Sequence, residues 1–79
     1  MGTKNNPGDF DCYANAEPDE PMFVLLARDV QAPLIVRQWA FSYRQRKVAE
    51  NQWNEQAQKK YSEALNCANG MDRWHLENR

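Results

Sequence analysis

The sequence predicts an all-α protein in which a flexible N-terminal arm and a short helix precede two longer helices that form an antiparallel hairpin. In the second half of the chain, apolar residues recur every three or four positions, which is the spacing of one helix face. Neither glycine nor proline interrupts the chain between Pro33 and Gly70. The one strand-like run, residues 22–26, has no second such run with which to pair. These observations favour helices over a sheet.

Residues 1–17 have the composition of a flexible arm, and residues 18–79 are expected to form a single helical domain. The arm contains Pro7, Gly8 and three asparagines. Its large apolar residues, Phe10 and Tyr13, could anchor it against the body of the protein. The strongest apolar content follows in residues 18–40, where we expect the core to form.

The short helix is expected over residues 20–28. Asp19 is a good N-cap residue, Glu20 places a negative charge in the first turn, and Pro21 is tolerated there. The apolar run at residues 22–26 would also suit a buried strand, but the lack of a partner strand favours the helix.

The second helix is expected to begin at Pro33, after a turn at residues 29–32, and to end between residues 46 and 50. Proline suits a first helical residue, because the N–H at that position needs no partner within the helix. Residues at three- and four-residue spacing place one apolar stripe on this helix, and they are Val36, Trp39, Ala40 and Tyr43.

A turn near Asn51 is expected to separate this helix from a last one, which begins at about residue 54 and reaches Trp74 or beyond. Alanine is frequent on the apolar stripe of the last helix, so a neighbouring helix could approach it closely. Gly70 could end or fray this helix, since glycine costs about 1 kcal/mol relative to alanine in a helix. The alternative is a single uninterrupted helix from Pro33, about 55 Å long.

Charge is distributed unevenly, although the 79 residues sum to −1. Residues 1–20 carry a net charge of −4 and residues 21–79 carry +3. The acidic arm and the basic body could pair within or between chains. A chain this short buries a small fraction of its surface, so we expect a homo-oligomer. The weak net charge argues against general nucleic-acid binding.

The apolar runs of the chain are too short for a membrane-spanning helix or for the core of a signal peptide. None approaches the roughly 18 apolar residues of a membrane span, and the first ten residues lack the apolar core of a signal peptide. We therefore expect a cytoplasmic protein that binds no membrane. In a reducing compartment, Cys12 and Cys67 would stay free thiols.

The residue types used in catalysis and metal binding are widely dispersed. His75, the only histidine, lies eight residues after Cys67, which is about 12 Å of helical rise. Cys12, Cys67 and His75 contain no close pair of zinc ligands, and the isolated glycines form no phosphate loop. We therefore predict that the protein is not an enzyme and has no catalytic residue, metal or cofactor.

One segment with binding character interleaves basic and aromatic residues, namely Arg37, Trp39, Phe41, Tyr43, Arg44, Arg46 and Lys47. Guanidinium groups bind phosphates or carboxylates and aromatic faces stack on bases, but core aromatics beside a solvated basic face would give the same pattern. Arg28 and Asp29, at the helix junction, could pair, cap the next helix or line a notch for a small anionic ligand. The predicted ligand-binding residues are Arg28, Asp29, Arg37, Tyr13 and Asn15.

Two strings in the chain resemble a group of short proteins encoded by bacteriophages and prophages of Gram-negative bacteria. One is CYANAEPDEPMFVLLARDVQAPLIVRQWA, residues 12–40, and the other is EALNCANGMDRW, residues 63–74. The pattern of the group is Y-x-N-A-x-P-D-E-P-x-F-V-L-x-A-R-D-x-x-A-P-x-x-V-x-x-W-A, followed by E-A near an M-x-x-W ending. The likeness covers about half of the chain and leaves out RQRKVAENQW, residues 44–53.

The resemblance implies a phage context and supplies no catalytic residues. Small phage proteins without catalytic motifs commonly bind and block a host component. We therefore expect a protein of the host cytoplasm that binds and sequesters a component of host defence, either an effector protein or a small anionic signalling ligand such as a nucleotide. The alternative is a phage regulator that binds host RNA polymerase and alters transcription, and a hydrolase that destroys a signal is a third possibility.

Overall fold

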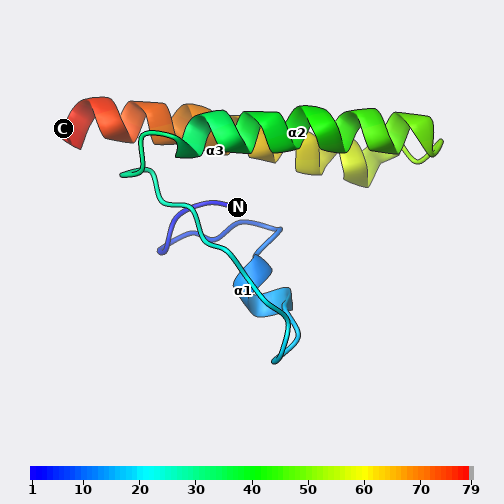
Figure 1. The fold of residues 1–79 in the computed structure, drawn as a ribbon, viewed down its shortest axis with the longest axis horizontal. Coiled ribbons are helices and arrows are strands. Elements are labelled where there is room, and N and C mark those ends of the chain that lie inside the picture. Colours follow the sequence, from blue (N-terminus) through cyan, green and yellow to red (C-terminus); the bar gives the residue numbers. More distant parts are fainter. Residues whose placement is uncertain (79) are drawn as a thin grey trace.

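The computed structural model describes residues 1–78 and contains three helices, α1 (Cys12–Asn15), α2 (Ala32–Ala49) and α3 (Glu55–Asn78). α2 and α3 pack side by side as a hairpin, and the N-terminal arm runs beside them with α1 at its far end (Figure 1). No strand is assigned among the described residues. The predicted all-α class, with a short helix before two longer ones, is confirmed.

α2 begins where the sequence predicts it, after a turn closed by Asp29. The Asp29 carboxylate accepts the Gln31 N–H at 2.9 Å, and the Asp29 carbonyl accepts the Ala32 N–H at 3.0 Å. Pro33 then occupies the first turn, where a missing N–H costs little. Asp29 therefore acts in the turn that starts the helix.

The hairpin turn lies at Asn51, as predicted. Asn51 has a φ of 56°, in the left-handed region that asparagine tolerates better than most residues. Its N–H donates to the Val48 carbonyl at 3.1 Å, and the Gln52 N–H donates to the Lys47 carbonyl at 2.7 Å. This pair of bonds is a Schellman motif, which satisfies carbonyls at the end of α2. The single uninterrupted helix is therefore excluded.

α3 begins with a side-chain cap and continues past its glycine. Asn54 Oδ1 accepts the Ala57 N–H at 2.8 Å, three residues on, as an N-cap does. Gly70 lies inside the helix, which continues to Asn78 instead of ending near the glycine. The predicted extent, to Trp74 or beyond, is confirmed.

The helix predicted over residues 20–28 is wrong, because this segment is irregular and the short helix is α1. The Glu20 N–H donates to the Glu17 carbonyl at 3.1 Å, which closes a turn with Pro18 and Asp19 at its centre. Proline favours that position of a turn and disfavours helical conformation in the residue before it. Asp19 thus belongs to a turn and not to a helix cap.

α1 is capped by Asp11. The Asp11 Oδ1 accepts the N–H groups of Tyr13 and Ala14 at 3.1 and 3.4 Å, and Asn15 Nδ2 donates to the Asp11 carbonyl at 2.8 Å. Irregular chain then leads from α1 to α2. The boundary predicted between the arm and the helical domain, at residues 17 and 18, stays a prediction.

The core of the hairpin consists of alanines. Those that are no more than 2 % exposed come from both long helices, and they are Ala32, Ala40, Ala57, Ala64 and Ala68. The expectation that residues 18–40 hold the core is wrong for their first half, in which Phe23 and Val24 are 85 % and 65 % exposed. Because this half is not helical, its apolar side chains form no stripe that could face the hairpin.

Ala64→Leu should destabilise the hairpin. Ala64 is fully buried on α3, so a larger side chain would push the helices apart or take a strained rotamer. Overpacking of this kind costs about 1–3 kcal/mol. Urea denaturation followed by circular dichroism measures the loss in the free energy of unfolding.

Gly70→Ala is the control on the same helix. A Cβ built at Gly70 has no neighbour within 4 Å, and alanine favours a helix by about 1 kcal/mol over glycine. This substitution should therefore raise the free energy of unfolding. An Ala64→Leu variant as stable as the wild type would show that the alanine stripe is not the contact between the helices.

Candidate functional site

Arg37, one of the predicted ligand-binding residues, joins the two long helices. Its Nη2 donates to Asn69 Oδ1 at 2.9 Å and to Asp72 Oδ2 at 2.6 Å. The guanidinium therefore already has a carboxylate partner across the hairpin. Since the side chains of Arg37 and Asp72 are 32 % and 50 % exposed, solvent screens the pair and limits its contribution to stability.

Asp29, a second predicted residue, lines a hollow of about 370 Å³ where the segment before α2 meets the start of α2 and the end of α3. The other lining residues are Ala27, Val30, Pro33, Asp72, His75 and Leu76, and we call this space the junction hollow. It is mostly apolar and holds the carboxylates of Asp29 and Asp72, but its lining includes no lysine or arginine. This charge does not suit the anionic ligand expected at the junction.

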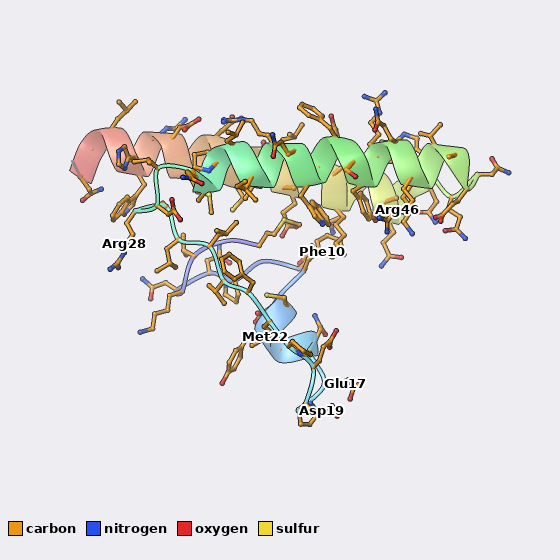
Figure 2. The ribbon with its side chains drawn as sticks, in the orientation of Figure 1. Phe10, Glu17, Asp19, Met22, Arg28 and Arg46 are labelled. Carbon is orange, nitrogen blue, oxygen red and sulfur yellow. The ribbon has the colours of Figure 1, made fainter. Side chains whose placement is uncertain are left out.

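The other three predicted residues lie outside the junction hollow. Arg28 is exposed on the loop before α2 and points away from the hairpin (Figure 2). Tyr13, 80 % exposed, and Asn15, bonded to the Asp11 carbonyl, both lie in α1 at the far end of the arm (Figure 1). The structure does not gather the five residues into one site. Ligand binding by any of them stays a prediction.

A second hollow, of about 450 Å³, lies where the end of α2, the start of α3 and the arm meet. Its lining consists of Phe10, Tyr43, Lys47, Gln52, Asn54, Gln56, Ala57 and Lys60, and we call it the lysine hollow. Figure 2 shows Phe10 between the rest of the arm and the hairpin. Three segments that are distant in the sequence therefore line the same hollow.

Two ammonium groups lie beside aromatic rings in the lysine hollow. Lys60 Nζ lies within 5.7 Å of three ring centroids, those of Phe10, Trp39 and Tyr43. Lys47 Nζ lies 5.6 Å from the Tyr43 centroid. These distances fall within the roughly 6 Å range of cation–π attraction. Within residues 1–78, no carboxylate lies within 4.0 Å of either ammonium.

The N-terminus of α3 lies at the lysine hollow. Asn54 caps the helix, and Gln56 in its first turn also lines the hollow. Backbone N–H groups of a first turn lack partners within the helix and carry the positive end of the helix dipole. Glu55, the acidic residue of this turn, is exposed and is not part of the lining. The hollow thus combines two lysines with a helix N-terminus.

The rings beside the lysines also contact one another. Trp39 and Tyr43 stack at 4.9 Å between centroids, with 17° between their planes. Farther toward the hairpin turn, Arg44 lies 5.7 Å from the centroids of Trp53 and Tyr61, which meet edge to face at 5.5 Å. The half of the hairpin nearer its turn therefore contains two groups of cationic side chains that lie over aromatic rings.

An ion pair fastens the arm to α3 next to the lysine hollow. Lys59 Nζ donates to Asp9 Oδ2 at 2.6 Å. This hydrogen bond and the attraction of the opposite charges lower the pKa of Asp9 and raise the pKa of Lys59. The pair is present above the pKa of Asp9 and is lost as the pH falls through it. Both groups are exposed, so solvent screens the pair and it contributes little to the stability of the fold.

The first residues of the arm fold back on themselves beside α3. The Met1 amino group donates to the carbonyls of Pro7 and Phe10 at 3.1 and 2.6 Å. It also lies 3.5 Å from Glu63 Oε1, a buried oxygen with no hydrogen-bond partner, so this contact is ionic. Gly8 has a φ of +80°, and a Cβ there would lie 2.5 Å from the Met1 carbonyl oxygen. Glycine is therefore needed at this position.

Both cysteines are free thiols, exposed at Cys12 and half-buried at Cys67. Burial raises the pKa of the Cys67 thiol, which lowers its fraction of reactive thiolate. Among the described residues, no group of three His, Cys, Asp or Glu side chains is placed to hold a metal ion.

Comparisons of this chain with protein-family models, curated proteins and solved structures find no match. Within residues 1–78, no helix has both the length and the apolar content needed to cross a membrane. Of the two hollows described above, the lysine hollow is the one whose lining contains lysines beside aromatic rings.

The sequence alone does not predict that the residues of the lysine hollow lie together. Tyr43 and Lys47 belong to the basic and aromatic segment that it singles out, but Phe10 comes from the arm and Lys60 from α3. Lys60 is four residues before Ala64, so helical spacing places it next to the contact stripe, and this is a signal that could have found it. No sequence pattern brings Phe10 to the same place.

Arg37→Ala should lower the free energy of unfolding by about 0.2–1 kcal/mol, because it removes both bonds to α3 and exposed ion pairs have that range. Arg28→Ala removes the same charge from the exposed loop and should change stability by less than about 0.5 kcal/mol. Urea denaturation of both variants beside the wild type measures the difference. Equal effects would contradict the bridging role of Arg37.

Proposed function

We propose that the chain is a non-enzymatic phage protein that binds and sequesters an anionic component of host defence in the host cytoplasm. The observation that carries the proposal is the pair of ammonium groups, of Lys47 and Lys60, that face the lysine hollow from two helices. Ammonium groups without a carboxylate partner keep their charge available for a ligand. An anion that enters the hollow would supply that partner.

The lining of the lysine hollow supports binding. It consists of two lysines, three amides, two aromatic rings and an alanine, with no carboxylate, histidine or cysteine among them. Those groups are frequent acids, bases and nucleophiles in enzymes, and lysine and tyrosine, which do line the hollow, can also take these roles. In the proposal the ligand is held unchanged, which is what sequestration requires.

The phage-like strings supply the context of the proposal. Residues 12–40 include Trp39, whose ring lies beside Lys60, and residues 63–74 include part of the alanine stripe. Residues 44–53, which include Lys47, lie outside the strings. The resemblance therefore supports a phage origin, while the choice of an anionic ligand depends on the hollow itself.

Exposed apolar side chains support self-association as part of the proposal. On the segment before α2, Phe23, Val24 and Val30 are 85 %, 65 % and 70 % exposed, and Leu34 on α2 is 57 % exposed. Exposed apolar side chains of this size can contribute to a contact with another chain. A second copy of the chain would cover them and add to a core that alanines alone make small.

The alternative, a phage regulator that binds host RNA polymerase, is favoured by the turn at residues 17–20, which follows α1. Figure 2 shows Glu17 and Asp19 at this acidic tip, far from the hairpin. Phe23 is exposed nearby in the sequence. An acidic tip with an apolar neighbour could dock on a basic protein surface. Such docking would not involve the lysine hollow, so substitutions in the hollow separate the two functions.

Phage growth on a defended host tests the proposal. Expression of the chain in a bacterium whose defence uses an anionic signalling molecule should restore plaque formation by a phage that this defence blocks. Lys47→Ala combined with Lys60→Ala should abolish the rescue, because the hollow then contains no cation. Arg46→Ala removes an adjacent exposed charge that lies outside the lining, so this variant should still rescue the phage.

Circular dichroism checks that the double variant folds, and alanine at both positions favours the helices. Absence of rescue by the wild type, or full rescue by the double variant, would contradict the proposal. Pull-down of polymerase subunits by the wild type and the double variant alike would support the alternative.

A further inference from the structure

We infer that the ligand of the lysine hollow is a nucleotide, with its phosphate between Lys47 and Lys60 and its base against the ring of Phe10. The inference rests on the proposed function, since it names the chemical class of ligand for the same site. It depends on three features of the hollow: the placement of the cations, the placement of the rings, and the volume.

The two cations suit a phosphate group. Lys47 reaches the hollow from the last turn of α2 and Lys60 from the second turn of α3, and both ammonium groups lie within 5.6 Å of the Tyr43 ring centroid. A phosphate has several acceptor oxygens, so it can take charge-assisted hydrogen bonds from both lysines. The first turn of α3, which lines the hollow with Gln56, adds the positive end of a helix.

The rings suit a base. Phe10 and Tyr43 both line the hollow, and aromatic side chains of this kind provide stacking surfaces for bases. Trp39 stacks on Tyr43 at 4.9 Å, so the Tyr43 ring is held in place before a ligand arrives. The amide of Gln56 offers a donor and an acceptor to the edge of a base.

Charge, rather than volume, favours this hollow over the junction hollow. Its volume of about 450 Å³ falls in the range of roughly 300–1,000 Å³ that is usual for small-ligand sites. The junction hollow, of about 370 Å³, is also large enough, but its lining includes no lysine or arginine and its Asp29 carboxylate would repel a phosphate, while the charge of Asp72 is paired with Arg37. An acidic protein loop would pair with the lysines without stacking on Phe10, so a loss of binding on removal of that ring distinguishes a nucleotide from such a loop.

Isothermal titration calorimetry of the full chain tests the inference. The probes are ADP, 3′,5′-cyclic AMP and cyclic di-AMP, with adenosine and inorganic phosphate as the separate halves of a nucleotide. At least one nucleotide should bind, and adenosine and phosphate should each bind at least about tenfold more weakly, because each makes only part of the contacts. Added salt should weaken nucleotide binding.

Substitutions test which residues contact the phosphate of the ligand and which contact its base. Lys47→Ala and Lys60→Ala should each weaken nucleotide binding at least about tenfold, through loss of a charge-assisted hydrogen bond. Phe10→Leu keeps an apolar anchor for the arm but removes the stacking surface, and should weaken binding about fivefold or more. Arg46→Ala, outside the lining, should leave the affinity within about twofold. Lys60→Arg keeps the charge and should retain binding. Binding by this variant would show that Lys60→Ala fails because it lacks the cation and not because substitution at this position unfolds the chain.

Three results would overturn the inference: no nucleotide binds, the Lys47→Ala Lys60→Ala variant binds as well as the wild type, or adenosine binds as tightly as ADP. If no nucleotide binds while the lysines are still required for phage rescue, the inference fails and the proposed function stands. If a nucleotide binds at the lysines and the chain gives no rescue, the proposed function fails and the nucleotide site stands.

Discussion

The close contact of α2 and α3 through alanines is the constraint on which the rest of the structure depends. Five alanines from the two helices are buried, and in the part of the chain that the structure describes no large side chain is fully buried. Small side chains at a helix contact allow the two backbones to approach closely. The larger residues are therefore displaced to the edges of the hairpin, where they remain partly exposed.

This displacement produces the lysine hollow. Trp39 and Tyr43 flank the alanine contact on α2 and stack on each other, and Lys60 on the opposite helix lies over both rings. The arm then adds Phe10, whose ring lies 5.7 Å from Lys60 Nζ at the same edge, next to the Asp9–Lys59 pair. A wide core of large apolar residues would have enclosed these rings. The narrow alanine core leaves them at the surface, where a ligand can reach them.

Local signals were sufficient to predict the hairpin, because its stripes, its turn at Asn51 and the start of α3 at Asn54 depend on neighbouring residues. The arm was harder to predict, since Pro18 and Asp19 suit a turn as well as a helix start, and the turn is what forms. The candidate site was harder still. Phe10 and Lys60 meet only in the folded chain, and the charge of Arg37, predicted to hold a ligand, is paired within the hairpin.

Amide chemical-shift perturbation of the ¹⁵N-labelled chain, titrated with the nucleotide that binds most tightly, tests most directly whether the lysine hollow is the binding site. If it is, the largest shifts fall on Phe10, Tyr43, Lys47 and residues 52–60, and they follow a single saturation curve. Shifts concentrated on residues 27–33 and 72–76 would place the ligand in the junction hollow and contradict the assignment, as would the absence of any saturating shift.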